Sequence, residues 1–162
     1  MSRFAPAFLV LSWVVMGFSF AFFVPMAWDW FGEGGTHVHV WAWCFAFTLA
    51  TGAWLWVRTR HANRELTVRD GFLLVTLVWV VLPVYAALPL MYAVQGLSFT
   101  DAYFEAMSGL TATGATAMAG LDLLAPSVNI WRCFLQLIGG LGIMLLAVAI
   151  LPFLGLCGTQ LY

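Results

Sequence analysis

The stretch GLTATGAT, Gly109 to Thr116, combines hydroxyl side chains and two glycines within a chain that is otherwise strongly apolar. If its backbone runs extended, the carbonyls of residues 111–114 can face a common axis and replace the hydration shell of a cation. Gly114 can reach a positive φ at low cost. The chemistry predicted here is coordination of a desolvated cation by main-chain oxygens.

A short helix is predicted directly before this stretch, over Asp101 to Leu110, with Phe99, Thr100 and Asp101 supplying the capping side chains. At about 1.5 Å per residue this helix reaches about 15 Å, half of a bilayer's hydrocarbon core. A half-membrane helix and a polar return are typical of a re-entrant pore loop. From these residues alone, an ordinary external loop behind a surface helix remains the alternative.

The composition is that of a membrane protein, since 64% of the 162 residues are hydrophobic, 8% are charged and the mean hydropathy is +0.98. Six basic and seven acidic residues are too few to cover the surface of a soluble domain of this length. A net charge of −1 argues against nucleic acid as a partner, because phosphate binding needs a basic face. The lipid bilayer is therefore the expected surrounding.

Four segments are long and apolar enough to cross a bilayer, which needs roughly 20 apolar residues. They are Ala5 to Trp28, His37 to Val57, Gly71 to Val94 and Ile130 to Phe153. The predicted fold is an all-α membrane protein. It has four transmembrane helices plus a re-entrant pore helix (101–110) and an extended filter strand (111–116) between helices three and four.

The arginines predict the orientation. One precedes the first span and four occupy the loop between spans two and three: Arg3, Arg58, Arg60, Arg64 and Arg69. The loop between spans one and two has Asp29 and Glu33 and no basic residue. Because basic loops stay in the cytoplasm, we expect a multi-pass protein of the cytoplasmic (inner) membrane with a cytoplasmic amino terminus.

Several residues outside the hydroxyl-rich stretch are candidates for supporting it. Arg132 could form an outer ion-pair cluster with Asp101, Glu105 and Asp122, either to hold the pore helix or to attract cations. Gly139, Gly140 and Gly142 interrupt the fourth span, either for close helix packing or as a soft point beside the ion path. The pore-support candidates are Glu105, Arg132, Gly139 and Gly140.

Two long tracts carry a resemblance to a known family. FTDAYFEAMSGLTATGATAMAGLD (99–122) followed by WRCFLQLIGGLGIMLLAVAILPFLGLCGTQLY (131–162) resembles the first pore repeat of the TrkH/KtrB superfamily of potassium-uptake proteins, in its TrkH branch. Members carry four helix, pore loop, helix repeats around one permeation path, and the TrkH branch adds two leading helices. The resemblance implies leading helices and an Arg-rich loop over 1–66 and one repeat over 67–162.

The resemblance also implies the ligands of the ion. The family's filter glycine corresponds to Gly114, and potassium is expected at backbone positions Thr111, Ala112, Thr113, Gly114 and Ala115. The second glycine of a TVGYG filter is replaced by Thr116, which leaves discrimination between potassium and sodium open. No cofactor is expected beyond potassium as the transported ligand.

One repeat supplies one wall of a pore that needs four. The remaining repeats are expected from the rest of a longer chain, other copies or a split partner, and the end at GTQLY after span four favours a fragment or split form. The resemblance further implies a dimer of complete pores and a cytoplasmic nucleotide-binding regulatory ring.

The resulting prediction is potassium uptake, with sodium as an open second ion, through one quarter of a cation-permeation pore. It is not an enzyme, since no nucleophile and base, phosphate loop or metal cluster is visible in the sequence. Two alternatives are a noncatalytic membrane assembly or regulatory subunit, and a membrane oxidoreductase, which would need redox ligands.

Overall fold

The structure, a computed structural model, describes residues 4–32, 34–61 and 67–150, and it contains helices and no strand within those ranges. The elements are α1 (Ala5–Ser19), η1 (Phe20–Phe22), α2 (Phe23–Gly32), α3 (Val38–Thr59), α4 (Val68–Ala93), α5 (Phe99–Leu110), η2 (Leu121–Leu123) and α6 (Pro126–Ile150). The predicted all-α fold is confirmed.

The four predicted spans are present as four helical stretches long and apolar enough to cross a membrane. They are Ala5–Gly32, Val38–Thr59, Arg69–Ala93 and Pro126–Ala147. The first joins α1, η1 and α2 and continues four residues beyond Trp28, where the sequence predicted its end. Arg3, Glu33, Arg64 and Phe153, on which parts of the prediction depended, lie outside the described residues.

Asp29 lies in the part of α2 that extends beyond the predicted end. It belongs to the helix and is fully buried, rather than lying in an acidic loop. Its carboxylate accepts hydrogen bonds from the backbone N–H of His37, at 2.9 Å, and from the hydroxyl of Thr36, at 3.4 Å. One side chain of α2 thus organises the turn into α3, because it satisfies donors that have no partner inside a helix.

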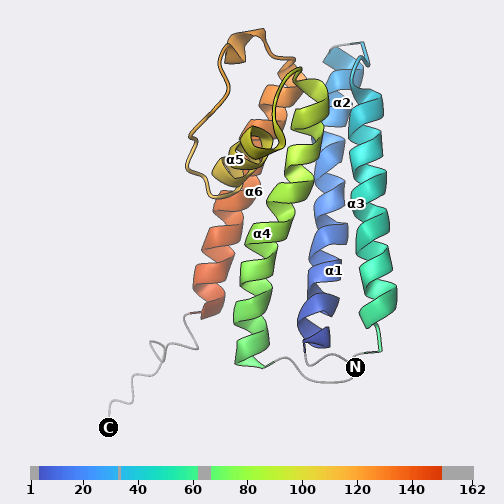
Figure 1. The fold of residues 1–162 in the computed structure, drawn as a ribbon, viewed down its shortest axis with the longest axis vertical. Helices are drawn as coiled ribbons and strands as arrows, with labels where there is room; N and C mark the ends of the chain where they lie inside the picture. Colours follow the sequence, from blue (N-terminus) through green and yellow to red (C-terminus); the bar gives the residue numbers. More distant parts are fainter. Residues whose placement is uncertain (1–3, 33, 62–66, 151–162) are drawn as a thin grey trace.

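The four long helices lie side by side in a bundle (Figure 1). The short helix α5 packs against α4 and α6, partway along the bundle, and the chain after it rises again to the end at which α6 begins (Figure 1). The segment between α4 and α6 therefore starts at one end of the bundle, reaches partway along α4 and α6, and returns to the same end.

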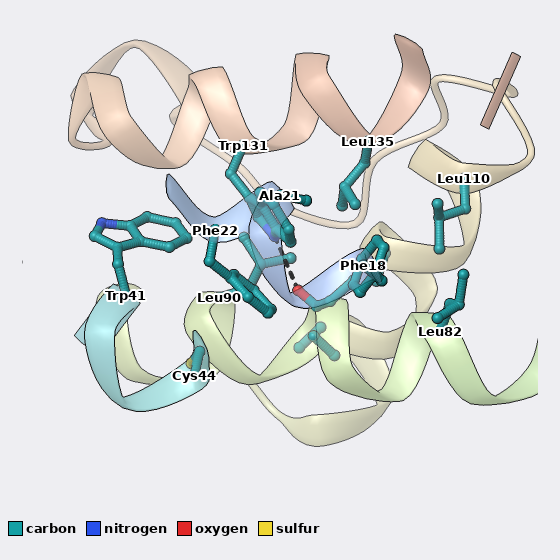
Figure 2. Close-up of a cluster of buried hydrophobic side chains, with 14 of the residues drawn as sticks. Phe18, Ala21, Phe22, Trp41, Cys44, Leu82, Leu90, Leu110, Trp131 and Leu135 are labelled. Atoms are coloured by element: carbon teal, nitrogen blue, oxygen red, sulfur yellow. Dashed lines mark hydrogen bonds between the residues drawn. The ribbon is translucent and has the colours of Figure 1, made fainter. Parts of the chain in front are cut away.

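An aromatic cluster joins α6 to the leading helices. The ring of Trp131 stacks on Phe22, with centroids 4.7 Å apart, and meets Trp41 edge-on at 5.8 Å (Figure 2). The indole N–H of Trp131 donates to the carbonyl of Ala86 in α4 at 3.0 Å, the dashed line in Figure 2. These buried contacts hold the start of α6 against the other helices, and α5 packs against α4 and α6.

Candidate pore loop

The helix α5 begins two residues earlier than predicted and has a different cap. Ser98 is the N-cap, and its hydroxyl oxygen accepts a bond of 3.1 Å from the backbone N–H of Asp101. The prediction that Phe99, Thr100 and Asp101 would cap the helix was wrong. The bonding pattern decides this point, since a cap residue accepts from an N–H two or three positions later.

Small residues seat the last turn of α5 against α6. A β-carbon on Gly109 would lie 3.0 Å from the β-carbon of Leu135, and one on Gly139 would lie 1.9 Å from the carbonyl oxygen of Leu110. Leu110 and Leu135 both belong to the buried hydrophobic cluster (Figure 2). The carboxyl end of α5 is therefore fixed by backbone contact, and the loop that follows starts from a defined point.

The loop after α5 turns its N–H groups back onto the end of that helix. Ala112 donates to the carbonyl of Gly109 at 2.8 Å, and Thr113 and Gly114 donate to the carbonyl of Ser108 at 2.9 and 3.5 Å. A trans peptide is planar, so each N–H points opposite to the carbonyl of the preceding residue. The carbonyls of residues 111–113 are consequently directed away from α5.

These outward carbonyls are available as ligands. Within the described ranges, no group donates a hydrogen bond to the carbonyls of residues 111–114. All residues from Thr111 to Ala117 are exposed on this chain. The loop therefore presents a short row of main-chain oxygens on the surface of the chain, and cation coordination by them stays a prediction.

Two residues of the loop have positive φ. Gly114 has φ +73°, as expected for its proposed role, and Ala112 has φ 54°. The described loop is irregular rather than a regular extended strand, because these left-handed residues and the bonds to Ser108 and Gly109 keep it close to the helix end.

Glu105 holds the outward limb of the loop. One carboxylate oxygen accepts from the backbone N–H groups of Ala117, at 2.6 Å, and Met118, at 3.2 Å, and from the hydroxyl of Thr116. The other oxygen bonds both Nε and Nη2 of Arg132, each at 3.1 Å. Because Glu105 is only 3% exposed, its charge is balanced inside the protein rather than by water.

The structure thus brings together two members of the predicted ion-pair cluster, Glu105 and Arg132. Asp101 instead bonds the hydroxyl of Ser98 at 2.7 Å, and Asp122 lies in η2. The predicted pair of glycines is also divided, since Gly139 touches Leu110 whereas a β-carbon on Gly140 would meet nothing within 4 Å.

Substituting Glu105→Gln should destabilise the loop strongly. The neutral amide leaves Arg132 without its buried counter-ion, and breaking one side of such a pair costs about 3–5 kcal/mol. We expect a lower unfolding temperature of the protein in detergent. Asp101→Asn is the matched control, since that carboxylate lies at an exposed helix cap. Equal effects of both substitutions would contradict the role given to Glu105.

Sequence reasoning missed Ser108. Its hydroxyl donates to the carbonyl of Ala115 at 2.6 Å, although serine inside a short helix carries no signal that its partner lies seven residues later. Sequence reasoning also missed Gln136. Its amide nitrogen lies 3.9 Å from the position that a β-carbon on Gly114 would take. Among the described residues, no group of three or more His, Cys, Asp or Glu side chains could hold a metal ion.

Comparison with known proteins finds one family and several relatives. Residues 37–162 match the model of the TrkH family, described as cation transport protein. The chain is 54% identical over 104 residues to the Trk system potassium uptake protein TrkH of Halomonas elongata, covering 64% of this chain and 22% of that protein. It is 51% identical to TrkH of Escherichia coli strain K12 over the same length and with the same coverage.

A solved structure is also similar. The crystal structure of the potassium transporter TrkH from Vibrio parahaemolyticus superposes with a TM-score of 0.88 at 37% sequence identity. The match covers 99% of this chain and 34% of that one. The chain therefore spans much less than two thirds of the length of the proteins it resembles.

Proposed function

Because this chain belongs to the TrkH family of cation transport proteins, we propose that it forms one quarter of a potassium-permeation pathway. Family membership and four apolar helices make it a membrane protein. The predicted alternative, a noncatalytic assembly or regulatory subunit, is not favoured, since the relatives are named as potassium uptake proteins.

The observation that carries this proposal is the row of outward carbonyls at residues 111–113. Potassium binds where several carbonyl oxygens replace its water, and a cation at this row would also face the negative end of the α5 dipole. Three oxygens from one repeat form one wall of such a site. The ligand is potassium, with sodium as a possible competitor, and no cofactor takes part.

Two features of the structure support a re-entrant position of α5 in the bilayer. The segment between α4 and α6 starts and ends at one end of the bundle and reaches partway along it (Figure 1), which suits a re-entrant pore helix and filter. The end of α3 carries Arg58 and Arg60, stacked over Trp54 and Trp56 at 4.9 and 5.8 Å, at the end where α1 begins. Basic residues favour the cytoplasm, so the loop would enter from outside the inner membrane.

The remaining walls must come from other repeats. Carbonyls left in lipid would cost several kcal/mol each, so the exposed loop needs polar or aqueous surroundings. Other repeats of a longer chain, further copies or a split partner would provide them. A dimer of complete pores and a cytoplasmic nucleotide-binding ring complete the proposed assembly.

Growth of a potassium-uptake-deficient strain at low potassium tests the function. We expect rescue, together with rubidium uptake, when the chain is produced with the remaining three repeats. A control lacking this chain but containing the other repeats should not grow. Absence of rescue despite a normal amount of assembled protein in the membrane would contradict the proposal.

A further inference from the structure

We propose that Ser108 is a positioning residue that sets how many carbonyls this loop offers to the ion, an inference that rests on the proposed pore function. Ser108 is 6% exposed and lies in the last turn of α5. Ser108 supplies no outward carbonyl to the loop, and it makes no hydrogen bond to Glu105. Its two oxygens nevertheless hold the loop on both sides of Gly114.

The main-chain oxygen of Ser108 holds the first side. It accepts from the N–H groups of Thr113 and Gly114 at 2.9 and 3.5 Å. Because the peptides are planar and trans, these two bonds direct the carbonyls of Ala112 and Thr113 away from the helix. The outward direction of two ligands is thus fixed by one acceptor.

The hydroxyl of Ser108 holds the part of the loop that follows Gly114, and it turns a carbonyl toward α5 rather than away from it. It donates to the carbonyl of Ala115 at 2.6 Å and so draws that oxygen toward α5. The row of outward carbonyls therefore stops before Ala115, which the sequence had included among the ligand positions. Since selectivity among alkali cations depends on the number and field of coordinating carbonyls, this bond affects ion choice.

The peptide between Ala115 and Thr116 depends on this external constraint. Among the described residues, the hydroxyl of Ser108 is the one hydrogen-bond donor to the carbonyl of Ala115, and the exposed loop has no regular ladder to hold that peptide. Without this hydroxyl, rotation about ψ of Ala115 and φ of Thr116 can turn the carbonyl outward. The loop would then offer the ion a different set of oxygens.

Ser108→Ala tests this assignment in the protein assembled with all its repeats. We expect the ratio of rubidium to potassium uptake to change by about fivefold, the equivalent of one lost hydrogen bond. Ser19→Ala is the matched control, because Ser19 is fully buried and its hydroxyl also donates to a backbone carbonyl at 2.6 Å, that of Met16. Its ion ratio should not change.

The size-matched variant Ser108→Cys separates loss of the bond from loss of folding. A thiol is a weak donor that occupies similar space, so we expect a smaller change of the ratio in the same direction. If Ser108→Ala does not reach the membrane, Ser108→Cys decides alone. An unchanged ratio in whichever variant is assembled would overturn the role of Ser108.

This outcome is distinguishable from failure of the pore assignment. If unaltered protein rescues growth and the Ser108 variants leave the rubidium to potassium ratio unchanged, only the positioning role is wrong. If unaltered, assembled protein carries neither rubidium nor potassium, the pore proposal fails and the Ser108 inference fails with it.

Discussion

Gly114→Asp is expected to abolish ion uptake, and Gly114→Ser to reduce it or to alter the potassium to sodium ratio by about tenfold. A side chain at φ +73° is strained by about 1–2 kcal/mol, and relief of that strain rotates the adjoining peptides. Space is not the cause, since a β-carbon there would meet only Gln136, at 3.9 Å. The aspartate adds a negative charge beside the ion. Rubidium uptake in intact cells measures the loss of transport, and uptake of potassium against sodium measures the ratio.

Gly96→Ser provides the control for backbone strain. Gly96 has φ +79°, and a β-carbon on it would meet nothing within 4 Å, so its substitution imposes a similar strain. It lies in the turn between α4 and α5, away from the outward carbonyls. Uptake should stay close to that of unaltered protein. A loss as severe as that of Gly114→Ser would mean that strain anywhere in this region, rather than ligand geometry, governs transport.

The long helices could be predicted from the sequence because hydropathy and length are local properties. Their packing could not. Asp29 looks like a loop residue next to Gly32 and Gly34, yet it is buried because the donors it satisfies come from the next turn. The cap of α5 was misplaced for a related reason. Ser98 and Asp101 are both good cap residues, and only the bonding pattern distinguishes them.

The candidate site shows the same division. Gly114 could be predicted because only glycine reaches its φ cheaply, and the pair of Glu105 with Arg132 because buried charges need partners. The role of Ser108 depends on how the loop folds back onto α5, a contact between segments with no sequence periodicity. That contact also decides which carbonyls face outward, so ligand number is a property of the folded loop.

Gly139→Ala is expected to have the second largest effect. Its β-carbon would lie 1.9 Å from the carbonyl oxygen and 2.5 Å from the carbonyl carbon of Leu110, and backbone atoms cannot move aside as a flexible side chain does. The end of α5 must shift away from α6, at a cost of about 3 kcal/mol or more. Ser108 lies at that end of α5, and the loop starts there. Uptake should therefore fall together with the unfolding temperature in detergent.

Gly140→Ala and Gly142→Ala distinguish close packing from helix flexibility, the two roles that the sequence left open for these glycines. A β-carbon at either position would meet nothing within 4 Å of the described chain. Alanine favours helix over glycine by up to about 1 kcal/mol, so both variants should be as stable as the unaltered protein or slightly more. If they instead lost uptake as Gly139→Ala does, a soft point in α6 would be the better explanation. If only Gly139→Ala lost uptake, the close contact of Gly139 with Leu110 would be the reason that glycine is needed in α6. Through that contact α6 fixes the position of the end of α5 and of the loop that follows it.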